Sequence, residues 1–198
     1  GSQDQVAVAF GGFNKITFAP GNVIEVHPVK ASPERLQELN DRLMFFFTGF
    51  SRTASEVAAE WIKNTPKKEK ELHIMREMVD EATDILCDEK QNINKFGILL
   101  NKAWQIKRGL NHAITTNHID KIYEKAMEAG AIGGKLLGAG NGGFMIIYAD
   151  PEVQPRVREA LSDLLHVPFK FEFSGSRIVQ NGTDFIPHIL NNGIPPLS

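Results

Sequence analysis

The sequence lacks the features that mark secreted, membrane-spanning or nucleic-acid-binding proteins. It holds one cysteine, Cys87, so no internal disulfide can form. Its 22 basic and 24 acidic residues give a formal net charge of −2, which provides no field of one sign to attract a polynucleotide or an anionic membrane. No apolar run approaches the roughly 20 residues that span a bilayer. These absences predict a cytoplasmic protein without a nucleic-acid or membrane partner.

Metal-binding and reactive-thiol patterns are also missing. Among the six histidines, His112 and His118 are six residues apart, and no pair has the i, i+4 spacing that a zinc site would require. We therefore predict no metal site. Cys87, in "TDILCDEK", and the two tryptophans, Trp61 and Trp104, fall on the apolar stripes of expected helices, so we expect all three to be buried structural residues.

The apolar patterns along the 198 residues predict an α+β protein. The expected order is two short strands, a short helix, a buried strand, four helices, a strand, a helix and a last strand. The late β-α-β portion, which follows long helices, is typical of a split β-α-β sandwich of the ferredoxin-like kind. Gly1 and Ser2 resemble a cleavage scar, and no initiator methionine follows them, so we expect a piece of a longer protein.

Local signals place the first elements. Two apolar alternations flank the turn residues Pro20, Gly21 and Asn22, which predicts a hairpin. Ser32 as N-cap and Pro33 in the first turn predict a short helix. The apolar segment "LMFFFTGF" then predicts a wholly buried strand.

Helices dominate the middle of the chain. After a helix that starts near Ser51, apolar residues three and four apart predict two long antiparallel helices, roughly Lys67 to Cys87 and Ile93 to Lys107. A further helix is expected to close at Gly130. Asp150 is expected to cap the next one, with Pro151 in its first turn.

The last third of the chain also contains the expected final strands. The segment "VPFKFEFSG", residues 167–175, alternates as a strand with one face in water. The stretch from residue 181 to the end is rich in Gly, Pro and Asn and predicts a loose tail.

A glycine run, "GGKLLGAGNGGFMII", occupies residues 133–147. Its letters "GAGNGG" fit the GxGxxG pattern, but that pattern binds a dinucleotide only where it opens a helix. Here "FMIIYA" follows, which favours a strand and contradicts the dinucleotide interpretation. Two interpretations stay open. The glycines allow a sharp turn or close backbone packing, or their bare N–H groups approach a substrate or its phosphate.

This run and three other segments together resemble the GHMP superfamily of small-molecule kinases, which includes galactokinase, homoserine kinase and mevalonate kinase. The others are "QDQ" ahead of "AFGG", "LMFFFTGFSRTASEV" and "KAWQIKRGL". The resemblance runs from Gln3 to about Val179. Within the superfamily the segments are most similar to the D-glycero-D-manno-heptose 7-phosphate kinases, with the L-fucose kinases as relatives.

The resemblance implies a domain organisation. Residues 1–30 would be the end of a GHMP amino-terminal domain, with the "QDQ" motif and the hairpin. Residues 31–180 would be the GHMP carboxy-terminal domain with its long helices, and residues 181–198 a flexible tail.

The resemblance also implies an activity, the ATP-dependent phosphorylation of a heptose 7-phosphate at its anomeric hydroxyl. Asp4 of "QDQ" matches the aspartate that lies beside the attacking hydroxyl, although by itself it would be an ordinary surface charge. A carboxylate there can accept or orient the hydroxyl proton. A glycine motif near the active site is implied for Lys135, Gly138, Gly140, Gly142 and Gly143.

Substrate-binding candidates lie in two further segments. Ser51 and Arg52, at an expected strand-to-helix junction, could receive a sugar phosphate, or Ser51 could only cap the helix and Arg52 be solvated. Lys107 matches a "W-x-x-K" pattern of the family, yet a cation at a helix end is already favoured by the helix dipole. Lys135 could face an anion or simply be exposed.

The family's phosphate loop, a Gly-Ser-rich stretch before a helix, has no counterpart in the sequence. ATP and Mg²⁺ are therefore implied for the complete enzyme only, and the missing amino-terminal half is the expected partner, with a homodimer possible. We expect this chain alone to bind ATP poorly and to show no turnover. Another GHMP sugar kinase of the fucose or galactose type, or a non-catalytic GHMP-like domain, are the alternatives.

Overall fold

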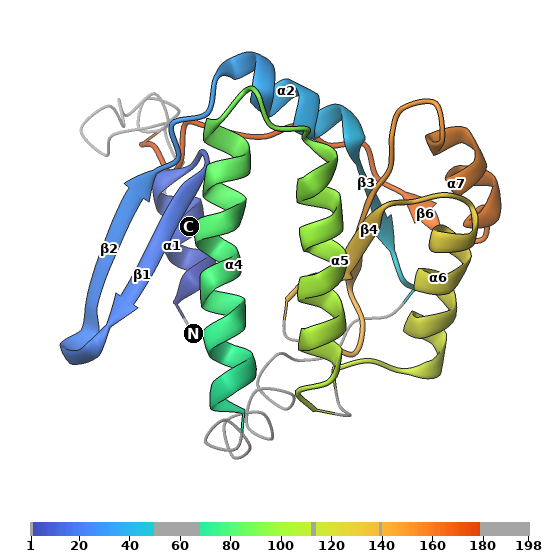
Figure 1. The fold of residues 1–198 in the computed structure, drawn as a ribbon, viewed down its shortest axis with the longest axis horizontal. Helices are drawn as coiled ribbons and strands as arrows, with labels where there is room; N and C mark the ends of the chain where they lie inside the picture. The colour runs from blue at the N-terminus through green and yellow to red at the C-terminus, as the bar shows by residue number, and fades with distance from the viewer. Residues whose placement is uncertain (1, 50–67, 112–113, 139, 179–198) are drawn as a thin grey trace, which may run out of the picture. The chain divides into compact units, whose positions relative to one another are not determined.

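The computed structural model describes residues 2–49, 68–111, 114–138 and 140–178 (Figure 1). The chain forms two compact units, of which the smaller contains residues 1–14 and 172–198 and the larger residues 15–171. Within the described ranges, no helix is long and apolar enough to cross a membrane. The domain boundaries proposed above, at residues 30 and 180, stay predictions.

The smaller unit is built around helix α1, Gln3–Phe10. Gly12 N–H donates to the Glu172 carbonyl at 2.8 Å and Ser176 N–H to the Ala9 carbonyl at 3.1 Å, so the segment after residue 171 is joined to the end of the helix. Gly11 has a φ of 65°, and an added Cβ there would lie 2.2 Å from the Gly175 nitrogen. The glycines of "AFGG" therefore allow two stretches of backbone to touch.

The predicted hairpin at the start of the larger unit is confirmed. Strands β1, Asn14–Ala19, and β2, Val23–Pro28, pair with each other across a short 3-10 turn, Pro20–Asn22. Gly21 and Asn22 have φ values of 78° and 61°, a conformation that glycine and asparagine adopt readily in turns.

The predicted helix and strand that follow are also confirmed. Helix α2, Pro33–Arg42, starts with the Ser32 hydroxyl accepting the Arg35 N–H at 3.1 Å. Strand β3, Leu43–Phe47, begins directly after it. Its burial differs from the expectation of a wholly buried strand, because only Met44 and Phe46 are fully buried and the intervening residues are half-buried.

A four-stranded sheet forms the centre of the larger unit. Its strands are β3, β4 (Gly133–Leu136), β5 (Phe144–Tyr148) and β6 (Leu165–His166), in the order β4-β5-β3-β6, and all pairs are antiparallel. One strand, helices, two strands, a helix and a last strand in this arrangement confirm the predicted ferredoxin-like sandwich. Strand β4 was not predicted as a separate element.

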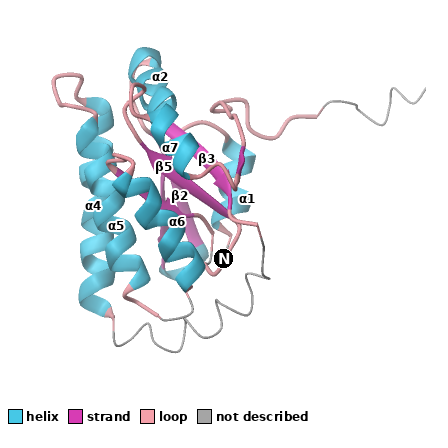
Figure 2. Ribbon diagram, turned by 90° about the vertical axis from the view of Figure 1, so that its right-hand side faces the viewer, coloured by secondary structure: helices cyan, strands magenta, loops and turns pink. Residues whose placement is uncertain are grey.

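Five helices accompany the sheet in the described part of the larger unit. Helices α4, Glu69–Cys87, and α5, Asn94–Arg108, run side by side in opposite directions, which confirms the predicted pair (Figure 1). Helix α6, Asn117–Glu128, ends before Gly130, whose φ is 103°, as predicted. Helix α7, Gln154–Ala160, and α6 lie over one face of the sheet (Figure 2).

The main core lies between that face and the helices. Alternate strand residues meet apolar residues of α5, α6 and α7, and the cluster includes Met44, Phe46, Trp104, Ile119, Ile122, Leu136, Met145, Ile147, Val157 and Leu161. Trp104 is completely buried, as expected, whereas Trp61 lies outside the described residues.

Three further local predictions were wrong. Asp150 does not cap α7, which begins at Gln154, because its carboxylate accepts hydrogen bonds from Arg42 Nε at 3.3 Å and Asn94 Nδ2 at 3.1 Å. Pro151 therefore lies in the turn before the helix. Cys87 is exposed, because Ile85 and Leu86 form the buried stripe at the end of α4.

The strand expected at residues 167–175 is the third. The ladder contains only Leu165 and His166, and the chain then leaves the sheet. Asn40 of α2 holds it there, since its amide accepts the Phe171 N–H at 3.2 Å and donates to the Phe169 carbonyl at 3.4 Å. An alternating pattern alone does not show whether a neighbouring strand or a side chain satisfies the backbone.

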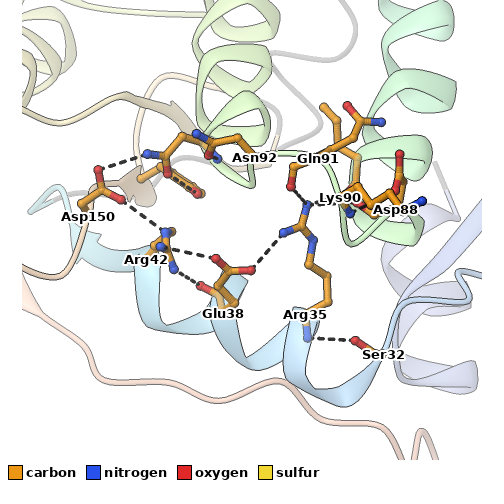
Figure 3. A network of polar contacts seen from close by, with 12 residues as sticks. Ser32, Arg35, Glu38, Arg42, Asp88, Lys90, Gln91, Asn92 and Asp150 are labelled. Atoms are coloured by element: carbon orange, nitrogen blue, oxygen red, sulfur yellow. Dashed lines mark hydrogen bonds and ion pairs between the residues drawn. The ribbon is translucent and has the colours of Figure 1, made fainter.

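A buried arginine joins α2 to the end of α4 (Figure 3). Arg35 is 5% exposed, and its Nη2 donates to the carbonyls of Ile85 and Gln91, both at 2.8 Å. Its Nη1 donates to Glu38 Oε2 at 2.9 Å. The guanidinium thus satisfies one carbonyl in the last turn of α4 and one in the segment after it, where a cation also meets the helix dipole favourably.

We expect Arg35→Met to lower the free energy of unfolding by about 2–4 kcal/mol, because it leaves buried carbonyls without a donor. Urea denaturation followed by tryptophan fluorescence measures the loss. Arg76→Met, at an exposed position of α4, is the matched control and should stay within about 0.5 kcal/mol of the unsubstituted chain. Equal effects of the two substitutions would contradict this role.

Candidate functional site

The glycine run forms the turn between β4 and β5. The described residues of this turn with a positive φ are Gly138 (70°), Gly140 (120°), Asn141 (63°), Gly142 (148°) and Gly143 (97°). Side chains other than that of asparagine are strongly disfavoured in this region of backbone space, which accounts for the glycine content. The run leaves the turn as strand β5, which confirms the strand predicted after it.

Backbone hydrogen bonds hold this turn at two points. Asn141 N–H donates to the Ile114 carbonyl at 2.9 Å, and an added Cβ at Gly140 would lie 2.8 Å from the same oxygen. The Gly143 carbonyl accepts both the N–H and the hydroxyl of Thr48, each at 2.8 Å. The turn is therefore fixed from the segment before α6 and from the end of β3.

Thr48 and His118 support the turn and were not singled out as site residues from the sequence. Thr48 is 1% exposed, and the His118 ring nitrogen Nε2 lies 3.1 Å from its carbonyl oxygen. A polar residue directly after the apolar strand "LMFFF" was the available signal for Thr48. His118 had no such signal, because its contact depends on a residue 70 positions away.

Lys107 lies in the last turn of α5 and reaches the glycine turn. Its Nζ donates to the Gly138 carbonyl at 2.7 Å, and the side chain is half-buried. Burial, and to a smaller extent the neighbouring charge of Lys135, lowers the pKa of the Lys107 ammonium to about 8. The side chain is held against the turn instead of extending freely from the helix end.

Lys135 lies on β4, two residues after Gly133, so the two residues share one face of the strand. That face meets α5, because an added Cβ at Gly133 would lie 2.0 Å from the Gly97 carbonyl oxygen. The Lys135 side chain is half-buried, and burial lowers the pKa of its ammonium. Within the described part of the chain, neither Lys107 nor Lys135 forms an ion pair with a carboxylate.

Arg108, the next residue on α5, has a different environment. Its Nη2 lies 3.0 Å from Asp120 Oδ1, which also accepts the Thr115 hydroxyl at 2.8 Å. The guanidinium charge is therefore matched by a carboxylate and links α5 to the start of α6. Arg108 has a structural function, and Lys107 beside it does not share that partner.

Close backbone packing sets the position of α5. Gly97 has no side chain, and an added Cβ there would lie 2.4 Å from Cδ1 of Tyr148. The Tyr148 hydroxyl donates to Asn94 Oδ1 at 3.0 Å, and burial raises the pKa of the phenol. These contacts fix α5 along β4, and with it the place where Lys107 meets the turn.

The remaining predicted site residues lie elsewhere. Asp4 is exposed in the first turn of α1, within the smaller unit. Ser51 and Arg52 lie outside the described residues. Among the residues that the structure describes, no group of three His, Cys, Asp or Glu side chains could hold a metal ion. The structure thus brings together Lys107, Lys135 and the glycine turn.

Known proteins with similar sequences are small-molecule kinases. Residues 81–167 match the family model described as GHMP kinases C terminal. The chain is 33% identical over 164 residues to the D-glycero-alpha-D-manno-heptose 7-phosphate kinase of Campylobacter jejuni, which covers 81% of this chain and 48% of that protein. It is 30% identical over 165 residues to the mevalonate kinase of Thermococcus onnurineus. That match covers 80% of this chain and 45% of the mevalonate kinase. The chain spans about half the length of these relatives.

A solved kinase structure has a similar fold. The D-glycero-D-manno-heptose 1-phosphate kinase from Bacteroides thetaiotaomicron superposes with a TM-score of 0.64 at 24% identity, over 91% of this chain and 50% of that one. At this identity the likeness supports the fold alone.

We expect the Lys107 ammonium to titrate with a midpoint near pH 8, as measured from its Cε chemical shift by NMR. The folded chain then binds fewer protons than the unfolded chain between about pH 8 and 10.5, so this group makes the free energy of unfolding rise with pH over that range. Lys107→Met should remove that part of the rise. A midpoint at or above pH 10 would contradict the burial of the ammonium.

Gly133→Ala should disrupt the packing of α5 on β4, because its methyl group would overlap the Gly97 carbonyl oxygen. We expect a loss of more than about 3 kcal/mol in the free energy of unfolding, measured by urea denaturation. Gly109→Ala is the control, since its φ is −78° and the nearest atom to an added Cβ is 3.4 Å away. The idea fails if the two variants unfold at the same urea concentration.

Proposed function

Because the chain contains the carboxy-terminal domain of the GHMP kinases, we propose that it supplies the acceptor-side part of an ATP-dependent sugar-phosphate kinase in the cytoplasm. The proposed acceptor is D-glycero-D-manno-heptose 7-phosphate, phosphorylated at its anomeric hydroxyl. The 33% identity to a protein named as a kinase of that compound supports this choice. The amino-terminal half of the complete protein is the proposed partner.

The observation that carries the proposal is the fixed glycine turn with two half-buried ammonium groups beside it. Phosphoryl transfer depends on positioning and on neutralising charge, more than on covalent chemistry by the protein. A rigid turn can serve as a wall that positions the acceptor. Lys107, and Arg52 with Ser51 in the segment outside the described residues, are proposed to hold its negative charge.

ATP and Mg²⁺ do not fit the described residues. The glycine turn enters a strand and not a helix, and the described residues offer no group of three metal-ligating side chains. We therefore assign both to the missing amino-terminal half, where ATP supplies the transferred phosphoryl group. The 198-residue chain alone is expected to show no turnover.

Asp4 is proposed to accept or orient the proton of the attacking hydroxyl. Its carboxylate is exposed in the first turn of α1, in the "QDQ" segment. In the larger unit, by contrast, the groups beside the glycine turn are the ammonium groups of Lys107 and Lys135. A carboxylate base and separate cationic groups are the two kinds of side chain that this reaction needs.

A second candidate is phosphorylation of mevalonate, favoured by the 30% identity to a mevalonate kinase. The fold does not decide between the two acceptors, because one fold serves many substrates. Comparison of heptose 7-phosphate, mevalonate, fucose and galactose as acceptors of the full-length protein distinguishes them. Preference for any of the last three would replace the proposed substrate.

Asp4→Asn in the full-length protein should lower kcat for heptose 7-phosphate by about 10²- to 10⁴-fold, with the KM for ATP unchanged, because the amide cannot take the proton. Steady-state kinetics with a coupled ADP assay measures both. Glu34→Gln, at an exposed position in the first turn of α2, is the control and should keep full activity. Turnover of Asp4→Asn within twofold of the unsubstituted enzyme would remove Asp4 from the mechanism.

A further inference from the structure

We propose that Lys107 and Lys135 together form the subsite for the phosphate group that the acceptor already carries, and so select phosphorylated over neutral sugars. This inference rests on the proposed kinase function and adds to it the group that the enzyme binds. The transferred phosphoryl group and ATP would be held elsewhere.

The charges of the two lysines are not balanced by a carboxylate among the described residues. Lys107 and Lys135 are both half-buried, and the charge of Lys135 is close enough to lower the pKa of the Lys107 ammonium; two such cations are unfavourable unless an anion accompanies them. Elsewhere in the described chain the buried or half-buried cations are matched: Arg108 by Asp120 and Arg35 by Glu38. A phosphate monoester carries close to two negative charges at neutral pH and would match both lysines.

The two lysines come from a helix and a strand that are packed against each other. Lys107 comes from the last turn of α5 and Lys135 from β4, and the contact of Gly97 with Gly133 holds these elements together. The cations therefore cannot separate without moving the helix from the sheet. A site whose charged groups are held by regular elements is organised before the ligand arrives, which reduces the entropy cost of binding.

The Lys107 ammonium keeps N–H donors that the turn does not use. An ammonium group has three N–H donors, and Lys107 uses one of them on the Gly138 carbonyl at 2.7 Å. Two are left for oxygen atoms of a ligand. The carbonyl also fixes the ammonium at the turn, in which Gly140 to Gly143 have consecutive positive φ values.

The ammonium groups also suit a phosphate better than the alternatives. Lysine binds phosphate oxygens as a compact point charge, and a phosphate monoester brings close to two negative charges, whereas the carboxylate of mevalonate brings one. A neutral sugar would leave both charges uncompensated. The pair therefore favours a sugar phosphate over mevalonate, fucose or galactose.

Phosphate binding by the 198-residue chain tests the subsite directly. Inorganic phosphate and glucose 6-phosphate are the probes, and the lysine Cε shifts are followed by NMR at pH 7. We expect both probes to shift Lys107 and Lys135, and Lys107→Met or Lys135→Met to weaken binding by about 10- to 100-fold. Lys102→Met, at an exposed position of α5, should bind as the unsubstituted chain does. Equal binding by all variants would overturn the subsite.

Kinetics of the full-length protein tests the selectivity. Lys107→Met and Lys135→Met should raise the KM for heptose 7-phosphate about 10- to 100-fold, with little change in kcat, and should lower kcat/KM for unphosphorylated heptose much less. A fall in kcat for both acceptors would overturn the proposal, because the lysines would then serve the transferred phosphoryl group. Lys107→Gln repeats the test if the methionine variant does not fold.

The two proposals can fail separately. If the full-length protein phosphorylates none of the acceptors but the chain binds phosphate through both lysines, the kinase function is overturned and the subsite stands. If heptose 7-phosphate is phosphorylated and neither lysine affects its KM, the subsite is overturned and the kinase function stands.

Discussion

The contact of α5 with β4 at Gly97 and Gly133 is the constraint on which the rest of the site depends. A methyl group at either position would overlap a neighbouring backbone or ring atom, so the helix and the strand meet backbone to backbone. This approach sets how far along the strand the end of the helix lies. Lys107 consequently reaches the turn that follows β4, and Lys135 lies on the strand face directed at the same helix. Two residues with no side chain thus determine where the elements that carry these two charged side chains lie.

Four cations of the larger unit differ in their partners. Arg35 and Arg108 have carbonyl or carboxylate oxygens around their guanidinium groups; Arg35 joins α2 to the end of α4, and Arg108 joins α5 to α6. Lys107 and Lys135 have no carboxylate partner among the described residues, although burial disfavours their charges. The arginine fork can satisfy several fixed acceptors at once, whereas a lysine leaves donors available for a ligand.

Sequence patterns predicted the elements whose signals are local, and failed where a distant residue decides. The hairpin, the capped helix α2 and the long helices were predictable from turn residues, Ser32 and apolar spacing. Strand β4 was not, since "GGKL" has little strand propensity and pairs only because β5 lies beside it. Asp150 has the residue type of a cap, but Arg42 and Asn94, over 50 positions away, bind it instead. In the site, the glycine turn was visible in the sequence, whereas the bond from Lys107 to Gly138 depends on tertiary packing.

The hydrogen bonds that run from His118 through Thr48 to Gly143 have a consequence for motion. They connect the start of α6, the end of the central strand β3 and the last residue of the glycine turn. A loop with this many glycines would ordinarily sample many conformations within nanoseconds. The bonds to Thr48 and Ile114 tie Gly143 and Asn141 to the surrounding fold and so restrict the motion of the turn. A conformational change that encloses a ligand would therefore have to come from another segment closing toward the turn, with the turn itself as the stationary side.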